Sequence, residues 1–158
     1  PEGHGINLGA PGRRVDVASG RVWHDAEGTY RRHASAITDK GDSIQWVAAS
    51  GREGEGTIPV YDLLRADYAV RLHFAELNPK VSPGDRVFDV FIDGKPVLTG
   101  FDILAKTGGP GRATVEEFVV AADMRLEIEL RRAGQAKKPP VISGIEVIAR
   151  GVDAARDK

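Results

Sequence analysis

The chain has no cysteine, no long apolar run and almost no net charge. Without cysteine it can form neither a disulfide framework nor a thiolate metal site, and the redox compartment cannot be read from thiols. No apolar run approaches the roughly 18 residues of a membrane-spanning helix, so we expect no membrane insertion. With 22 basic and 23 acidic residues, the net charge of -1 gives no overall field that would attract nucleic acid. We therefore expect a neutral or locally matched partner.

The sequence opens at Pro1, without an initiating methionine or a signal-like segment. We interpret it as a piece of a larger protein. Its 158 residues suit one domain with a single core, which would bury about two-thirds of the unfolded surface.

Strand-like alternation of apolar and polar residues is the strongest pattern in the chain. Residues 68–74 alternate cleanly, so we expect their apolar face to join the core, with His73 on the other face. Residues 86–92 have apolar side chains on both faces, which predicts a central strand. The Asp93-Gly94 pair supplies the positive-φ positions of a type I′ turn, so residues 95–98 should return antiparallel.

Further strands are predicted at residues 115–121, 124–130 and 141–148, with weaker candidates at 44–48 and 57–63. Within residues 124–130 the apolar set begins with Met124 and alternates with charged residues. Many short strands, with 19 glycines and 9 prolines for turns, favour an all-β fold. We predict a single-domain, jelly-roll-like antiparallel β-sandwich.

An enzyme would need titratable side chains that are held together. Glu76 with Asp89 or Asp102 could form the carboxylate pair of a hydrolase, but nothing in the sequence fixes such a pair. His73 and Glu76 are three residues apart in a strand, which places them on opposite faces. The motifs of a nucleophile elbow, a zinc peptidase and a phosphate loop are absent from the sequence. We expect the three carboxylates to bind loop backbones, and we expect no catalytic residue.

Two segments at a characteristic spacing, LHFAE at residues 72–76 and RVFDV at residues 86–90, resemble malectin-like domains. The resemblance covers roughly residues 5–149, which would leave an extension at 1–4 and a charged linker at 150–158. It implies a jelly-roll-like β-sandwich that binds carbohydrate without catalysis, appended in bacteria to larger extracytoplasmic proteins. The other matching segments are Ile6-Asn7-Leu8-Gly9, Trp23-His24-Asp25, Ile58-Pro59-Val60, Phe101-Asp102-Ile103 and Gly144-Ile145-Glu146-Val147.

In the family, aromatic residues on loops hold the sugar, and most of these positions differ here. Tyr30 corresponds to the first aromatic, but Glu53 stands where the second belongs. Asn78 and Pro79 replace a Tyr-Phe pair, and Lys137 lies near an expected aspartate. Stacking on the face of a pyranose requires an aromatic ring. The resemblance therefore implies the family scaffold with a glycan that is held in another way, or with no glycan.

Long or planar polar side chains take the place of the missing aromatics. Such groups satisfy sugar hydroxyls or pair with the carboxylate of an acidic sugar, so an anionic glycan is one interpretation. The other is that they are solvated loop residues. We expect Tyr30 to be accessible, and Trp23 and Trp46 to pack in the core. The candidate carbohydrate-binding residues are Tyr30, Arg52, Glu53, Asn78, Lys80 and Lys137.

No cofactor is expected, although Asp16, Asp25, Asp39 and Asp42 lie where a structural calcium ion could bind, without a spacing that defines a site. We predict a non-catalytic carbohydrate-binding module that attaches a larger bacterial protein to an oligosaccharide or polysaccharide, in a secreted or periplasmic setting. Its partners would be the glycan and the neighbouring domains of the parent protein. The alternatives are a structural or protein-interaction β-sandwich that has lost sugar binding, and a glycoside hydrolase or lyase.

Overall fold

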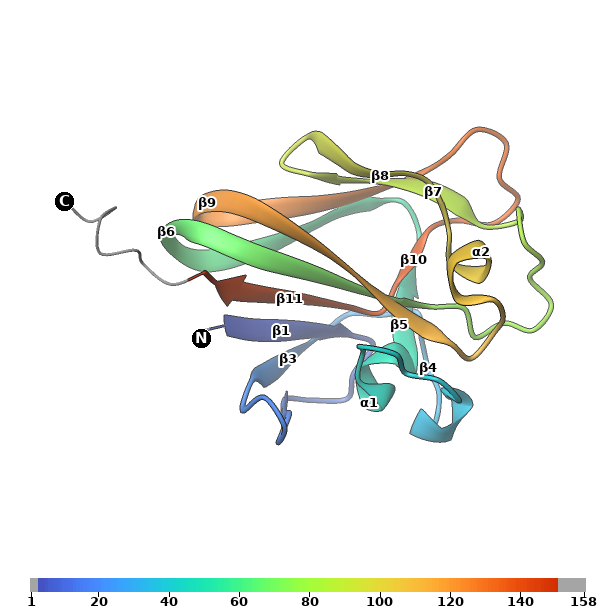
Figure 1. The fold of residues 1–158 in the computed structure, drawn as a ribbon, viewed down its shortest axis with the longest axis horizontal. Coiled ribbons are helices and arrows are strands. Elements are labelled where there is room, and N and C mark those ends of the chain that lie inside the picture. The colour runs from blue at the N-terminus through green and yellow to red at the C-terminus, as the bar shows by residue number, and fades with distance from the viewer. Residues whose placement is uncertain (1–2, 151–158) are drawn as a thin grey trace.

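The computed structural model describes residues 3–150 and consists mostly of β-strands (Figure 1). The expected linker beyond Arg150 lies outside the described residues. The first strand begins at Gly3, inside the segment that the sequence assigned to an extension. The elements are β1 (Gly3–Leu8), β2 (Arg14–Val15), β3 (Val22–Ala26), β4 (Tyr30–Arg31), a 3-10 helix (Ala34–Ala36), α1 (Gln45–Ala48), β5 (Ser50–Glu53), β6 (Gly56–Ala75), β7 (Val87–Ile92), β8 (Lys95–Asp102), α2 (Ile103–Thr107), β9 (Ala113–Arg132), β10 (Val141–Ile142) and β11 (Gly144–Ala149).

The strands form two sheets that confirm the predicted single-domain β-sandwich. One sheet has the order β2-β3-β1-β11-β6-β9-β7-β8, and the other has the order β10-β5-β4. Within the described residues these pairs are antiparallel apart from β1 and β3, which run parallel. Figure 1 shows the long β6–β9 ribbon crossing the molecule, with β7 and β8 on one side of it and β11, β1 and β3 on the other.

The β6–β9 ribbon bends near its middle, and the bend lets it contribute to the core along its whole length. Its register shifts between Tyr61 and Ala66, where Asp62 has a φ of 62° and the facing Met124 a φ of 74°. Such bulges increase the twist and redirect side chains. Leu63, an odd-numbered residue, therefore faces the core between the even-numbered Val60 and Tyr68.

Aromatic contacts join the two sides of the core. Phe74 of β6 lies 5.8 Å from Phe88 of β7 and 5.0 Å from Phe101 of β8, measured between ring centroids. The predicted core face of residues 68–74 is confirmed, because its four apolar side chains are buried. The Asp93-Gly94 turn is also confirmed, with φ values of 49° and 80°.

The outer face of β6 is covered as well. The ring of Trp23 lies 5.2 Å from that of His73, and both side chains are fully buried. Beside them, residues 44–48 do not form the strand that was weakly predicted, because Gln45–Ala48 is the short helix α1. Trp46 is consequently half-buried on this helix, whereas Trp23 is in the core as expected.

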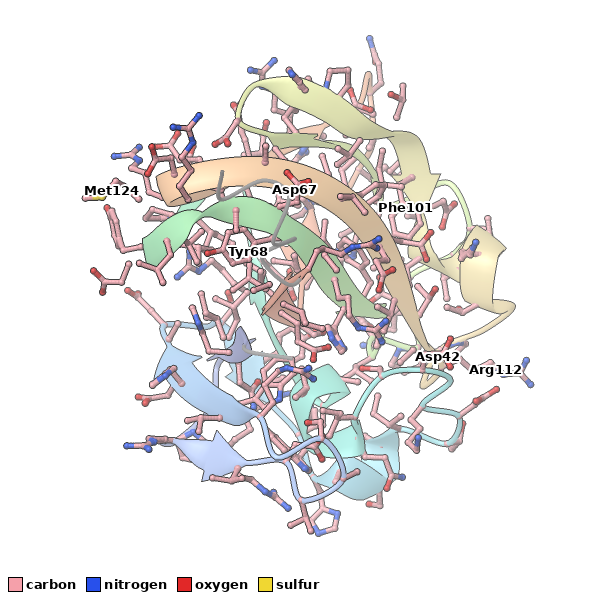
Figure 2. The ribbon with its side chains drawn as sticks, turned by 60° about the vertical axis from the view of Figure 1, so that its left-hand side comes forward. Asp42, Asp67, Tyr68, Phe101, Arg112 and Met124 are labelled. Carbon is pink, nitrogen blue, oxygen red and sulfur yellow. The ribbon has the colours of Figure 1, made fainter. Side chains whose placement is uncertain are left out.

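The bend accounts for the main errors in the strand predictions. Residues 115–121 and 124–130 belong to one strand, β9, instead of two. Met124 was assigned to the core face but is 72% exposed and points away from the body of the protein (Figure 2). Tyr61, on the facing strand, is likewise 57% exposed. Within residues 3–150, no helix is long and apolar enough to cross a bilayer.

The approach of Trp23 to Gly5 yields a prediction for the substitution Gly5→Ala. A Cβ at position 5 would lie 2.2 Å from Cδ2 of Trp23, so either β1 or the indole must move. Overpacking of this kind should lower the free energy of unfolding by about 1–3 kcal/mol, measured by urea denaturation. Gly109→Ala is the control, because a Cβ there meets no heavy atom within 4 Å. Equal stability of the two variants would contradict the proposed packing.

Candidate functional site

A pocket of about 340 Å³ opens at the loop end of the sandwich, where β4, β5 and the segment after β6 meet. We call it the loop pocket. Polar side chains dominate its wall, and Tyr30 supplies an aromatic ring. The lining residues are Tyr30, Arg32, Glu53, Glu76, Leu77, Asn78, Pro79 and Lys80.

A buried ion pair lies beneath this pocket. Nε of Arg86 donates to Oε1 of Glu76 over 2.7 Å, and both side chains are almost completely buried. Arg86 also donates to the Pro139 carbonyl over 2.7 Å, and its Nη1 lies 3.6 Å from Oε2 of Glu53. The pair thus ties the end of β6 to two other loops. Since a buried charge is costly without its partner, these contacts hold the pocket floor in one arrangement.

Tyr30 forms an inner wall of the pocket and is half-buried, less accessible than the sequence suggested. Its hydroxyl end lies over Gly51, where a Cβ would be only 2.7 Å from the oxygen. The guanidinium of Arg32 lies 5.3 Å from the centre of the Tyr30 ring. Burial, with a further contribution from Glu76 and Glu53, raises the pKa of the Tyr30 hydroxyl. Tyr30 therefore stays a neutral hydrogen-bonding group.

The outer wall is an exposed loop that is organised by its own polar groups. Oδ1 of Asn78 accepts a hydrogen bond from the backbone N–H of Lys80 at 3.0 Å. The backbone N–H of Asn78 in turn donates to Oε2 of Glu76 at 3.2 Å. This arrangement fixes the Asn78 side chain while the amide NH₂ has no hydrogen bond to other described residues, so it can donate to a ligand.

Four of the six candidate residues from the sequence line the loop pocket, namely Tyr30, Glu53, Asn78 and Lys80. Arg52 does not, because its Nε donates to the Glu27 carbonyl over 3.0 Å. Lys137 does not either: its side chain is 80% exposed, with Nζ 3.9 Å from Asp85. The sequence analysis missed Arg32 and the role of Arg86. Arg32 could have been noticed as a neighbour of Tyr30, whereas the pairing of Arg86 with Glu76 has no signature in the sequence.

The carboxylates considered for catalysis bind backbone N–H groups as expected, although the partner of Asp89 lies in strand β8 and not in a loop. Asp89 accepts a hydrogen bond from the Gly100 N–H at 2.8 Å, and Asp102 accepts one from Gly84 N–H at 2.6 Å. Asp102 also caps α2 by accepting from Leu104 N–H. Glu76 accepts from the Asn78 backbone, as expected, but is also paired with Arg86. These interactions give each carboxylate a structural role.

A chain of hydrogen bonds on the outer face of β6 has the residue types of a nucleophilic relay. Oγ of Ser43 lies 2.7 Å from Nδ1 of His73, and Nε2 of His73 lies 2.7 Å from Oε1 of Glu146. Since Glu146 can only accept, Nε2 carries the proton and Nδ1 accepts from Ser43. However, Ser43 and His73 are buried, and Glu146 is also paired with Arg21 and Arg71. Ser43 and Glu146 border a hollow of about 520 Å³, but Ser43 is only 3% exposed and Glu146 is held by two arginines, so we assign the network a structural role.

The titration of this network follows from its surroundings. Burial is the largest influence on the pKa of His73 and, together with the charge of Arg71, lowers it although Glu146 acts to raise it. Burial opposes ionisation of Glu146, but hydrogen bonds and charges from His73, Arg71 and Arg21 together keep its pKa below the usual range.

Within residues 3–150, no three side chains of the metal-binding types gather closely enough to hold an ion, so the four aspartates suggested for calcium do not converge.

A β-sandwich with a polar pocket on its loops has the architecture of a recognition domain, with the binding groups on loops and the core beneath them. Residues 58–145 match the Malectin domain family. This match spans more than half of the 158-residue chain, so the chain belongs to the Malectin domain family, as its resemblance implied.

The curated relatives are plant receptor kinases. A probable leucine-rich repeat receptor-like serine/threonine-protein kinase of Arabidopsis thaliana is 33% identical over 87 residues, which cover 51% of this chain and 8% of the relative. The nodulation receptor kinase of Pisum sativum is 30% identical over 82 residues, covering 52% and 8%. The chain thus matches less than a tenth of the length of these proteins. Their plant origin gives no support to the bacterial parent expected from the sequence.

Solved structures share the fold. The plant receptor-like kinase FER superposes with a TM-score of 0.78 at 16% identity, over 95% of this chain and 50% of that chain. The ANX2 ectodomain from Arabidopsis thaliana also gives 0.78, at 17% identity, over 94% and 50%. At this identity the likeness establishes the sandwich fold alone.

The buried state of His73 yields a prediction of pH dependence. Its pKa in the folded protein lies below the 6.5 of an unperturbed histidine, so the unfolded chain binds the proton first. The free energy of unfolding should therefore fall as pH drops below about 6.5. In His73→Gln this fall should be smaller, as measured by thermal denaturation between about pH 7.5 and 5, above the range in which Glu146 titrates.

The exposed His33 provides the matched control for this measurement. His33→Gln should change the pH profile less than His73→Gln does, because the His33 ring is exposed and accepts a hydrogen bond only at the start of a three-residue helix. Because burial also lowers the pKa of His4, the difference between the His73→Gln and unmodified profiles is the relevant quantity. Identical pH profiles for His73→Gln and the unmodified protein would contradict a neutral, buried His73.

Proposed function

We propose that this domain binds a saccharide in the loop pocket without catalysing its conversion, as part of a larger protein. The observation that carries the proposal is the convergence of Tyr30, Glu53, Asn78 and Lys80 at one pocket of about 340 Å³. Amide, ammonium, carboxylate and phenol groups match the mixed donors and acceptors of sugar hydroxyls. Membership of the Malectin domain family supports a carbohydrate-binding type of domain.

The absence of catalysis is supported by the state of the carboxylates. Glycoside hydrolysis requires two carboxyl groups that face the same bond, one as acid and the other as base or nucleophile. Around the loop pocket, Glu76 is held by Arg86, and Glu53 lies 3.6 Å from the same guanidinium. Both carboxylates therefore share one cation that fixes the pocket floor. A glycoside hydrolase or lyase is thus less consistent with this site than a binding module.

The setting of the domain is also part of the proposal. The similar structures include the ANX2 ectodomain and the ANXUR2 extracellular domain from Arabidopsis thaliana, and ANX2 is a plant receptor-like kinase. By analogy, this domain would lie outside the cytoplasm and attach a parent protein to a glycan or polysaccharide.

A protein-interaction role is the second candidate. A crystal structure contains the plant peptide RALF23 in complex with FER and LLG2, and this chain superposes on it with a TM-score of 0.76 over 92% of its length. The fold is therefore compatible with a protein partner. Under this alternative the loop pocket would bind no saccharide, and the domain would associate with a polypeptide.

The substitution Asn78→Asp tests the saccharide pocket. It keeps the acceptor that binds the Lys80 backbone but removes the two NH₂ donors of a side chain that lines the pocket. Loss of one or two hydrogen bonds to the sugar should weaken binding by about ten-fold. The measurement is isothermal titration with a panel of neutral and uronic-acid oligosaccharides.

A matched pair of lysines provides the control. Lys80→Gln should also weaken binding, because Lys80 lines the pocket, whereas Lys137→Gln should leave it unchanged. Equal effects of the two lysine substitutions would move the site away from the loop pocket. Failure of every oligosaccharide to bind the unmodified domain would favour the protein-interaction alternative.

A further inference from the structure

A second, larger pocket on the protein is lined by positively charged side chains and by no negatively charged ones. It has a volume of about 750 Å³, and we call it the arginine pocket because Arg13, Arg14, Arg31 and Arg32 line it. No aspartate or glutamate is among its lining residues. This is unexpected in a chain with 23 acidic and 22 basic residues.

The four arginines form no ion pair with an acidic side chain between residues 3 and 150. The neighbouring hollow that shares Trp46 differs, because there Arg21 and Arg71 are both paired with Glu146. The guanidinium groups of the arginine pocket are therefore available to an external anion, which they can bind in bidentate fashion.

The base of the arginine pocket is rigid. Oγ of the buried Ser50 donates to Oδ1 of the buried Asn7 over 2.9 Å. Nδ2 of Asn7 donates to the Trp46 carbonyl over 3.4 Å, which connects the base to α1. A ligand would thus meet a preformed surface with exposed arginine side chains around it.

The aromatic ring in this pocket does not favour a sugar. The guanidinium of Arg14 lies 4.4 Å from the centre of the Trp46 ring, so it covers one face of the indole. Trp23 contacts Trp46 edge to face, with 6.0 Å between the ring centroids. Stacking of a pyranose would have to displace one of these contacts. The arginine pocket therefore offers charge without an open stacking platform.

The pocket lies between two sheet edges. Arg14 belongs to β2, the outermost strand of the larger sheet, and Arg31 belongs to β4, the outermost strand of the smaller sheet. An edge strand can pair with an added extended segment through its backbone, while neighbouring side chains select the sequence of that segment.

We propose that the arginine pocket is a docking site for an extended acidic peptide segment, whose backbone lies along β2 or β4 and whose carboxylates pair with Arg14 and Arg31. The proposal is independent of saccharide binding in the loop pocket. Arg32 lines both pockets, so it is left unchanged in the test.

The probe is a fluorescein-labelled peptide of alternating glutamate and threonine, and the measurement is fluorescence anisotropy with the whole chain. The unmodified protein should bind it, and should bind the same peptide with glutamine in place of glutamate at least about ten-fold more weakly. The double variant Arg14→Gln, Arg31→Gln should lose affinity for the glutamate peptide by about ten-fold or more. Arg14→Lys with Arg31→Lys should give an intermediate loss, because charge remains but the planar fork is gone.

The matched control is Arg65→Gln with Lys95→Gln, which removes the same charge from two exposed positions outside the pocket. It should change the affinity by less than about two-fold at physiological salt. Equal losses in both glutamine double variants would overturn the proposal by showing non-specific attraction. The absence of peptide binding, or tighter binding of an oligogalacturonate that depends on Arg14 and Arg31, would overturn it as well.

Discussion

The structure depends on a single geometric constraint, the bend of the β6–β9 ribbon. Alternation along a strand would otherwise hold each residue on one face, and a shift of one residue exchanges the two faces. The two register shifts near Asp62 place Leu63 in the core and then restore the original alternation for Tyr68 and the residues that follow. One pair of strands therefore supplies the core on both sides of the bend. Because the second half of β6 is fixed in this way, its end delivers Glu76 to the loop pocket.

Besides its apolar core, the interior contains buried contacts between polar side chains. The Glu76–Arg86 pair and the His73–Glu146 pair lie on opposite sides of the same strand region, and each connects segments that are distant in sequence. The Glu76–Arg86 ion pair adds little net stability, because the cost of removing its charges from water offsets their attraction. Its effect is on geometry, since alternative loop positions would leave a buried charge without its partner. The contact of His73 with Glu146 is a hydrogen bond from a neutral imidazole, and it connects strands β6 and β11. The pocket floor is thus defined by electrostatics, whereas the sandwich is defined by apolar packing.

The features of the fold that were predicted correctly are those that depend on local patterns in the sequence. Residues 68–74 and the Asp93-Gly94 turn follow from alternation and from positive-φ preference, and both are confirmed. Met124 was misplaced because a bulge breaks the period without leaving a glycine or proline to mark it. Helix α1 has only four residues, too few for a helical period, so its apolar residues were read as a strand. The loop pocket was predicted in part, because the resemblance located its loops, but the direction of Arg52 and the burial of Tyr30 depend on tertiary contacts.

The charge distribution shows why the net charge of the chain is a poor guide to its surfaces. A value of -1 argues against a general attraction to polyanions, and that argument holds for the molecule as a whole. Screening limits such fields to about 8–10 Å, so a recognition surface is decided by the groups within one pocket. Arg14 and Arg31 are far apart in sequence, on strands of different sheets, and come together only through the fold. A chain can therefore be neutral overall while presenting one polar pocket and one cationic pocket, which allows the two to recognise chemically different partners.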